Sequence, residues 1–120
     1  MRVIIPGASG FIGKNLLTNV PHGWDIVATY NTDKSFLSFV EGLHSNKIVA
    51  EKCDFLNLHD LESLKRKCGA HYNLCIYLLA NSDPSKSVVD PSFDLRCNTE
   101  SLINFLQLFR INQFIFFSSG

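Results

Sequence analysis

The stretch that decides the fold stands near the start of the chain and reads Gly7-Ala8-Ser9-Gly10-Phe11-Ile12-Gly13. It follows an apolar run over residues 3–5 and opens an amphipathic segment over 11–20, which is the order strand, tight turn, helix. The free N–H groups and positive dipole end of such a helix can hold a phosphate. Glycines permit the sharp turn, the close approach of a pyrophosphate and close packing of helix on strand. The pattern predicts a dinucleotide-binding turn.

This glycine loop has two other interpretations. A nucleoside-triphosphate loop needs G-x-x-x-x-G-K-[ST]. Ala8 stands where its first glycine would be, and Asn15 follows Lys14 where serine or threonine is required, so the triphosphate motif fails at both ends. A glycine turn that only joins a strand to a helix stays open as the alternative.

Short apolar runs alternate with longer helical patterns along the chain. Strands are predicted over 2–5, 25–29, 47–51, 73–78 and 113–117, and helices over 11–20, 33–43, 58–68 and 92–109. This alternation is typical of βαβ units with right-handed crossovers, and therefore of an α/β fold with a parallel sheet. In the last helix, an apolar stripe is expected to face the sheet; it comprises Leu102, Phe105, Leu106 and Phe109.

Composition limits the classes of function. The 120 residues suffice for one domain, and eleven basic residues balance eleven acidic ones, which argues against a nucleic-acid or anionic-membrane surface. No run approaches the length of a membrane span. The four cysteines lack C-x-x-C spacing and are predicted to be buried reduced thiols of a cytoplasmic protein; they are Cys53, Cys68, Cys75 and Cys97. The histidines are expected in loops or at helix ends, without metal-site spacing; they are His22, His44, His59 and His71.

Four further motifs follow the glycine loop along the chain: Asp54-Phe55 after the third predicted strand, Leu78-Leu79-Ala80-Asn81 at the end of the fourth, Asn98 in the last helix, and Phe116-Phe117-Ser118-Ser119 at the end of the fifth strand. Taken in this order, the motifs resemble the extended short-chain dehydrogenase/reductase family, the NAD-dependent epimerase/dehydratases. The resemblance implies a Rossmann-type sheet of five strands in order 3-2-1-4-5, with helices on both faces. It assigns cofactor contacts to Gly7, Ser9, Gly10, Phe11, Ile12 and Gly13 of the loop, to Asp54 and Phe55 near the adenine, and to Leu79, Ala80, Asn81 and Asn98. It also places Ser119, next to Ser118 after the fifth strand, as the catalytic serine that hydrogen-bonds the substrate oxygen.

Each later motif also has a plainer interpretation. Asp54 could cap the loop before the next helix, and Asn98 could be a surface residue. Ser118 and Ser119 could be ordinary polar residues where a buried strand meets a loop. Their position supports a functional interpretation, because ligands of doubly wound sheets bind at the carboxyl ends of the strands.

Two departures from the family pattern stand out. NAD-preferring members carry an acidic residue after the second strand, where this chain has Tyr30. Without that carboxylate a 2′-phosphate is not repelled, and Lys34 could pair with it, so NADP is favoured over NAD; Lys34 could equally be a solvated charge. The family's catalytic Tyr-x-x-x-Lys is matched by spacing only at Tyr30 and Lys34. These lie at the adenosine end, too far from the nicotinamide, so the catalytic pair is expected beyond Gly120.

The resemblance implies that residues 1–120 are the NAD(P)-binding domain of an enzyme acting on a nucleotide sugar or related substrate, with the C-terminal substrate portion absent. We expect the chain to bind NAD or NADP without turnover. A non-catalytic NAD(P)-binding regulatory or sensing module is the alternative, and a fragment that binds nothing is a third. The apolar last strand and the last helix also predict self-association, as in a homo-oligomer.

Overall fold

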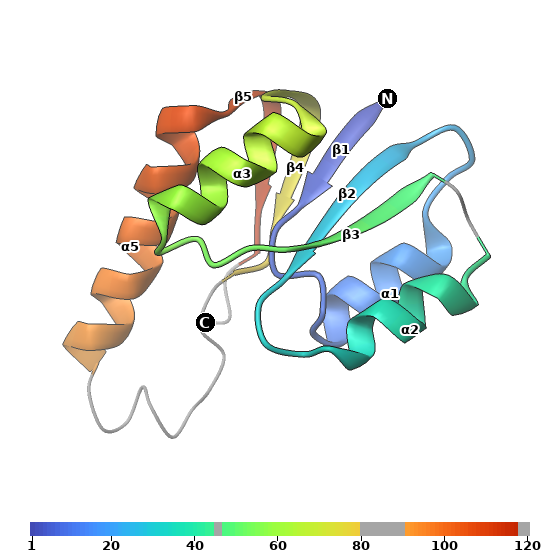
Figure 1. Cartoon of the computed structure of the whole chain (residues 1–120), viewed down its shortest axis with the longest axis horizontal. Helices are drawn as coiled ribbons and strands as arrows, with labels where there is room; N and C mark the ends of the chain where they lie inside the picture. The colour runs from blue at the N-terminus through green and yellow to red at the C-terminus, as the bar shows by residue number, and fades with distance from the viewer. Residues whose placement is uncertain (45–46, 80–90, 118–120) are drawn as a thin grey trace.

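The computed structural model describes residues 1–44, 47–79 and 91–117, with side chains described from residue 99 onward in the last helix. The strands are β1 Arg2–Ile5, β2 Asp25–Tyr30, β3 Ile48–Lys52, β4 His71–Tyr77 and β5 Arg110–Phe116. The helices are α1 Phe11–Asn19, α2 Ser35–Gly42, α3 Leu58–Cys68 and α5 Pro91–Leu108. The strands form one parallel sheet in the order β3-β2-β1-β4-β5 (Figure 1), which confirms the predicted class and strand order.

Helices cover both faces of this sheet (Figure 1). Side chains of successive strand residues point to opposite faces, so β1 contributes Val3 and Ile5 to one core cluster and Ile4 to the other. The first cluster includes Leu17 of α1 and other side chains from α1 and α2. The second includes Phe105 of α5 and side chains of α3. The central strands are therefore buried on both faces, as parallel sheets require.

Element boundaries differ from the prediction where long-range pairing decides them. β4 and β5 both begin earlier than predicted because His71 pairs with Arg110, and the Arg110 amide donates to the Ala70 carbonyl at 2.7 Å. His71 therefore lies in a strand, not in the predicted loop or helix end, and its ring bonds Asn112 at 3.0 Å. α2 is shorter than predicted; before it, the Asp33 carboxylate accepts from the Ser35 amide at 3.1 Å.

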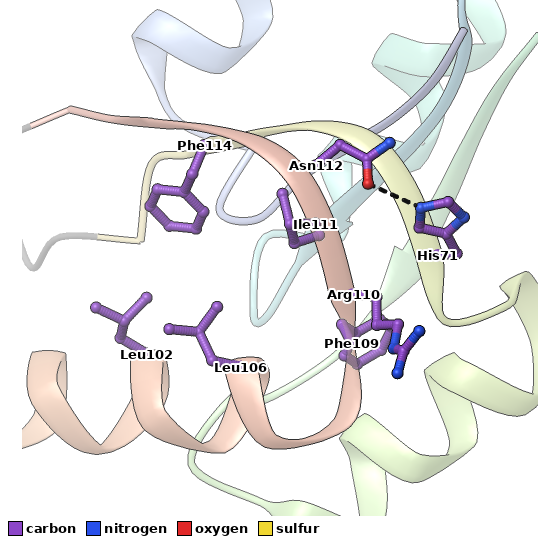
Figure 2. Close-up of a pocket in the computed structure, with 8 residues that line it drawn as sticks. All are labelled: His71, Leu102, Leu106, Phe109, Arg110, Ile111, Asn112 and Phe114. Atoms are coloured by element: carbon purple, nitrogen blue, oxygen red, sulfur yellow. Dashed lines mark hydrogen bonds between the residues drawn. The ribbon is translucent and has the colours of Figure 1, made fainter.

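The predicted apolar stripe of α5 is only partly correct. Phe105 and Phe109 are buried against the sheet and Leu102 is half-buried, but Leu106 is 50% exposed. Leu102 and Leu106 instead line a hollow of about 700 Å³ beside Phe114 of β5 (Figure 2). This side of the apolar face is therefore separated from β5 by an open hollow and is not packed tightly against it.

β5 is the edge strand next to β4 and remains exposed. Phe114, Ile115 and Phe116 each keep more than a third of their surface accessible. The sequence of β5 is more apolar than that of a typical exposed edge strand, and no element among the described residues covers it. No helix in the described part of the chain combines the length and apolar character needed to cross a bilayer.

Candidate dinucleotide-binding site

The candidate site lies at the carboxyl edge of the sheet, where the strand order changes direction between β1 and β4. β1 ends at Ile5 and the glycine loop leads directly into α1 at Phe11. In open parallel sheets this crevice is where ligands bind, because adjacent loops diverge to opposite faces there.

The glycine loop is held from both sides by neighbouring strands. The Gly7 amide donates to Thr29 Oγ1 at 3.1 Å, and the Ala8 amide donates to the Thr29 carbonyl at 2.8 Å. On the other side, the Leu78 amide donates to the Pro6 carbonyl at 2.9 Å. Thr29 was missed as a site residue, although its signal was a polar side chain inside an otherwise apolar strand. It is the one polar residue that is fully buried among the described residues.

The three glycines have different steric roles. Gly7 has φ +76, and a Cβ there would lie 3.0 Å from the Leu78 carbonyl group. A Cβ on Gly13 would lie 2.2 Å from the Ala8 oxygen, so this glycine permits the close packing of α1 on the loop. A Cβ on Gly10 would meet nothing within 4 Å beyond its immediate surroundings in the chain. The protein's own packing does not explain Gly10, and the free space beside it fits a group that approaches the backbone.

The first turn of α1 presents unpaired backbone donors at this free space. Gly10 is the N-cap and supplies no side chain to the N–H groups that follow, and no acidic residue stands in the first turn. Phe11 is 83% exposed and Ile12 is half-exposed, so their side chains do not cover the turn, and Ser9 is partly accessible. The residues present therefore fit an anionic pyrophosphate.

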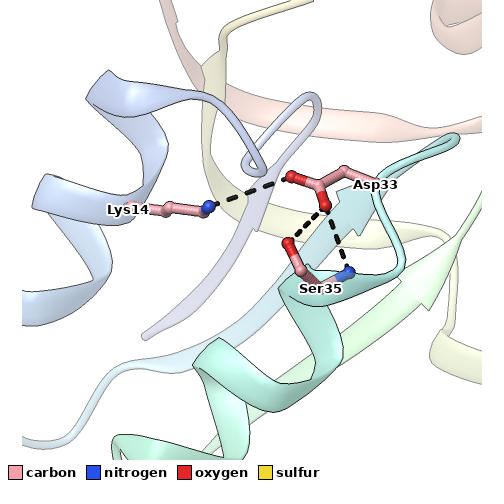
Figure 3. A network of polar contacts seen from close by, with 3 residues as sticks. All are labelled: Lys14, Asp33 and Ser35. Carbon is pink, nitrogen blue, oxygen red and sulfur yellow. Dashed lines mark hydrogen bonds and ion pairs between the residues drawn. The ribbon is translucent and has the colours of Figure 1, made fainter.

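A polar network stands beside the glycine loop, on its β2 side (Figure 3). Asp33 accepts hydrogen bonds from both the amide and the hydroxyl of Ser35, and its carboxylate lies 3.8 Å from Lys14 Nζ of α1. The hydrogen bond from the Ser35 hydroxyl is the main cause that holds the pKa of Asp33 below its usual value. Burial opposes it, and the Ser35 amide and then the Lys14 ammonium lower the pKa further by smaller amounts. Asp33 is thus a charged, half-exposed carboxylate. The sequence alone predicts no role for Asp33.

The two residues predicted at the adenosine ribose lie in different environments. Tyr30 ends β2 with a buried side chain, and its ring packs on Phe36 of α2 at 5.7 Å between centroids. Lys34 precedes α2, is exposed and forms no ion pair within the described ranges. The Tyr30 ring therefore belongs to the core, and Tyr30 brings no charge to the carboxyl edge.

The Asp54–Phe55 pair follows β3 and is fixed by its own loop. Asp54 Oδ1 accepts from the Leu56 amide at 3.0 Å, and the Asp54 amide donates to Asp60 Oδ2 at 3.1 Å. The Phe55 ring is buried, and its carbonyl accepts from Asn104 Nδ2 of α5 at 3.1 Å. The loop-capping interpretation of Asp54 is thus present in the structure, and its half-buried carboxylate still stands at the carboxyl edge.

Of the predicted residues at the other strand ends, the structure places one in detail. Leu79 follows β4, is half-buried, and its Cα would lie 3.1 Å from a Cβ on Gly7. Ala80, Asn81 and Ser119, with its neighbour Ser118, lie outside the described residues, and the Asn98 side chain is likewise not among those described.

The cysteines and hollows in the described part of the chain do not form a second candidate site. Cys53 and Cys75 are buried and free; burial raises the pKa of Cys53 to about 12 and also raises the pKa of Cys75. No cluster of ligating side chains there could hold a metal ion. The hollow in Figure 2 and another of about 400 Å³ beside α1 are lined mainly by apolar side chains. The glycine loop is therefore the candidate site because of its backbone N–H donors, and not because it lies in a deep pocket.

Comparison with known proteins decides the family. The model of the NAD dependent epimerase/dehydratase family matches residues 3–120. The chain belongs to this family. Membership in the NAD dependent epimerase/dehydratase family supports the use of a nicotinamide dinucleotide at the glycine loop. No curated protein sequence matched the chain.

Solved structures confirm the fold of this epimerase/dehydratase family member. Epimerase Mth375 from Methanothermobacter thermautotrophicus aligns with TM-score 0.77 at 24% identity, over 99% of this chain and 35% of that chain. The UDP-Glc/GlcNAc 4-epimerase from Campylobacter jejuni aligns with TM-score 0.70 at 18% identity, over 96% of this chain and 36% of that one. The UDP-glucose-4-epimerase from Stenotrophomonas maltophila, solved with NAD and formylated UDP-arabinopyranose, aligns with TM-score 0.70 at 19% identity over 90% and 33%. The chain thus spans about a third of their lengths.

Proposed function

We propose that this chain is the NAD(P)-binding part of an epimerase, dehydratase or related oxidoreductase that acts on a nucleotide sugar. One observation carries the proposal. Gly10 keeps open space in front of an uncapped helix N-terminus, at the switch point of the sheet, while Gly7 and Gly13 are explained by packing. A glycine that the fold itself does not need is explained by a ligand that approaches the backbone closely.

In this proposal, different residues at the carboxyl edge of the sheet contact different parts of the cofactor. The amides that follow Gly10 hold the pyrophosphate, and the side chains of Ser9, Phe11 and Ile12 border it. Asp54 and the backbone of Phe55 contact the adenine end, and Leu79, Ala80, Asn81 and Asn98 line the remaining path. Ser119 hydrogen-bonds the substrate oxygen. The bound nicotinamide supplies the hydride acceptor or donor.

The proposed nucleotide-sugar substrate and cytoplasmic location have their own support. The Stenotrophomonas enzyme shares this fold and was solved with a UDP-sugar. The free, buried thiols of Cys53 and Cys75 suit a reducing compartment. A preference for NADP remains a sequence-based prediction, founded on Tyr30 in the acidic position and on Lys34. The position of Asp33 supplies an argument for the opposite preference, developed below.

Titration calorimetry with NAD⁺ and NADP⁺ tests the proposal. We expect saturable binding of at least one, together with a rise in melting temperature that grows with ligand concentration, because the ligand binds only the folded chain. ATP with Mg²⁺ is the matched control, since the triphosphate motif fails at Ala8 and Asn15. A folded chain that binds neither dinucleotide would refute the proposal and favour the interpretation of the glycine loop as a simple connection.

Catalysis is expected to be absent from this chain, because Tyr30 and Lys34 form its one Tyr-x-x-x-Lys match and the Tyr30 side chain is buried. Purified chain supplied with a UDP-sugar and NAD⁺ should give no NADH absorbance and no epimerised sugar. Turnover above a no-protein blank would contradict this expectation. Dinucleotide binding without turnover is also the behaviour of a sensing module. A Tyr-x-x-x-Lys pair in the coding sequence after residue 120 would favour the enzyme, and its absence there would favour the sensing module.

A further inference from the structure

On the adenosine side of the candidate site, the position where the family pattern has its acidic residue carries no acidic side chain. Tyr30 occupies that position, and its ring is 7% exposed and packed on Phe36. The Tyr30 ring is held in the core, and its uncharged hydroxyl is no substitute for a carboxylate that accepts from two ribose hydroxyls. Another group must therefore select the ribose, or nothing does.

Asp33 is placed to take over this role. It lies in the loop that follows β2, about 20 residues beyond Gly13, the last glycine of the glycine loop. Dinucleotide-binding folds carry their ribose carboxylate at this spacing. Its side chain points toward the first turn of α1 (Figure 3). Both Ser35 donors fix its orientation, and about 42% of its side chain remains accessible to a ligand.

Lys14 keeps this carboxylate beside the glycine loop. Its ammonium lies 3.8 Å from Asp33 Oδ2 and 5.6 Å from the centre of the Phe39 ring of α2. Lys14 therefore links α1 to the β2–α2 connection beside the glycine loop. Because Asp33 already neutralises it, Lys14 is a poor partner for an added phosphate.

We propose that Asp33, positioned by Lys14 and Ser35, accepts hydrogen bonds from the adenosine ribose hydroxyls and makes this chain prefer NAD over NADP. The inference rests on the proposed function. A carboxylate accepts from two hydroxyls at once, whereas a 2′-phosphate would put two negative groups within a few ångströms of each other. The preference is thus the reverse of that expected from Tyr30 and Lys34.

The test compares dissociation constants for NAD⁺ and NADP⁺ by calorimetry in the unaltered chain and four variants: Asp33→Asn, Lys14→Met, Lys34→Met and Asp25→Asn. Asp33→Asn keeps an acceptor for Ser35 and removes the charge, so it should move the NADP⁺/NAD⁺ affinity ratio toward NADP⁺ by about tenfold or more. Lys14→Met should weaken NAD⁺ several-fold by releasing Asp33. Asp25→Asn is the matched control, because Asp25 is also half-exposed and also pairs with a lysine, Lys47, at the opposite end of β2.

The outcomes separate the two proposals. Unaltered chain that binds NAD⁺ more tightly, with the ratio changed by Asp33→Asn and not by Asp25→Asn, supports the role of Asp33. A ratio that Asp33→Asn leaves unchanged, or tighter NADP⁺ binding that Lys14→Met or Lys34→Met abolishes, overturns that role while dinucleotide binding stands. Binding of neither dinucleotide by folded chain overturns both. Circular dichroism of every variant establishes that the chain is folded.

Discussion

The Gly7 amide donates its hydrogen bond to the buried hydroxyl of Thr29, 3.1 Å away on the neighbouring strand. The turn that opens the candidate site is therefore fixed by β2, while its far side is tied to β4 through Pro6 and Leu78. This arrangement joins loop geometry to sheet assembly, because a shift of β2 relative to β1 would release the loop. The geometry of the glycine loop thus depends on the assembly of the sheet.

Replacing Thr29 by Val should destabilise the chain by about 1–3 kcal/mol, because the Gly7 N–H would keep its position and lose its partner. Urea unfolding followed by circular dichroism measures the change. Thr18→Val is the control, since the Thr18 hydroxyl bonds Lys14 O within an exposed helix turn, where water can replace it. Equal midpoints for the two variants would show that the loop does not depend on this bond.

Replacing Gly13 by alanine should mainly lower the stability of the chain, whereas replacing Gly10 by alanine should mainly weaken NAD⁺ binding. Gly13→Ala should cost about 3 kcal/mol of stability, because its Cβ would lie 2.2 Å from the Ala8 oxygen. Gly10→Ala should cost at most ~1 kcal/mol and should weaken NAD⁺ binding at least about tenfold, because the methyl group enters the proposed pyrophosphate space.

Unfolding midpoints and calorimetric titrations measure these two effects separately. Gly42→Ala, in the exposed last turn of α2, is the control and should be neutral or stabilising by up to about 1 kcal/mol. If Gly10→Ala left NAD⁺ affinity unchanged, the assignment of that space to a ligand would be wrong.

Alkaline pH should destabilise the chain through its buried weak acids. Burial raises the pKa of Cys53 from its ordinary 9.0 to about 12, and burial raises the pKa of Tyr72 from 10.0 to about 12. Above pH 9 the unfolded chain releases these protons and the folded chain retains them, so stability declines from there up to about pH 12. Urea unfolding at stepped pH should show this decline, and Cys53→Ala should make it shallower. An unchanged slope in that variant would contradict the role of Cys53.

The exposed edge strand should drive self-association, and one substitution should reduce it. Ile115 of β5 and Val49 of β3 stand on opposite edges of the sheet, and each is 45% exposed. A lysine on an edge strand opposes strand-to-strand pairing. Sedimentation velocity at increasing concentration should show association of the unaltered chain, reduced by Ile115→Lys and little changed by Val49→Lys. The reverse pattern would move the contact to β3, and a monomer throughout would refute the prediction.

Much of the fold was readable from the chain because local signals carried it. The apolar run 3–5, the three loop glycines and the helical period after Phe11 predicted the first βα unit. The alternation of elements, with the family resemblance, gave the strand order that the structure confirms. The start of β5 was not readable in this way. It depends on the pairing of His71 with Arg110, and a single sequence holds no signal for a contact between residues so far apart.

The class of fold, the glycine loop and the family resemblance could be predicted from the chain alone, because each rests on residue types at short, fixed spacings. Three features required the folded arrangement: which glycine the packing leaves free, the hydrogen bonds to Thr29 that anchor the loop, and the place of Leu106 in an open hollow beside β5. The tertiary structure also buried the Tyr30 side chain and turned Asp33 toward Lys14. These features depend on where distant segments meet in space, so the residues available to a ligand emerge only once β1, β2, β4 and their helices have packed together.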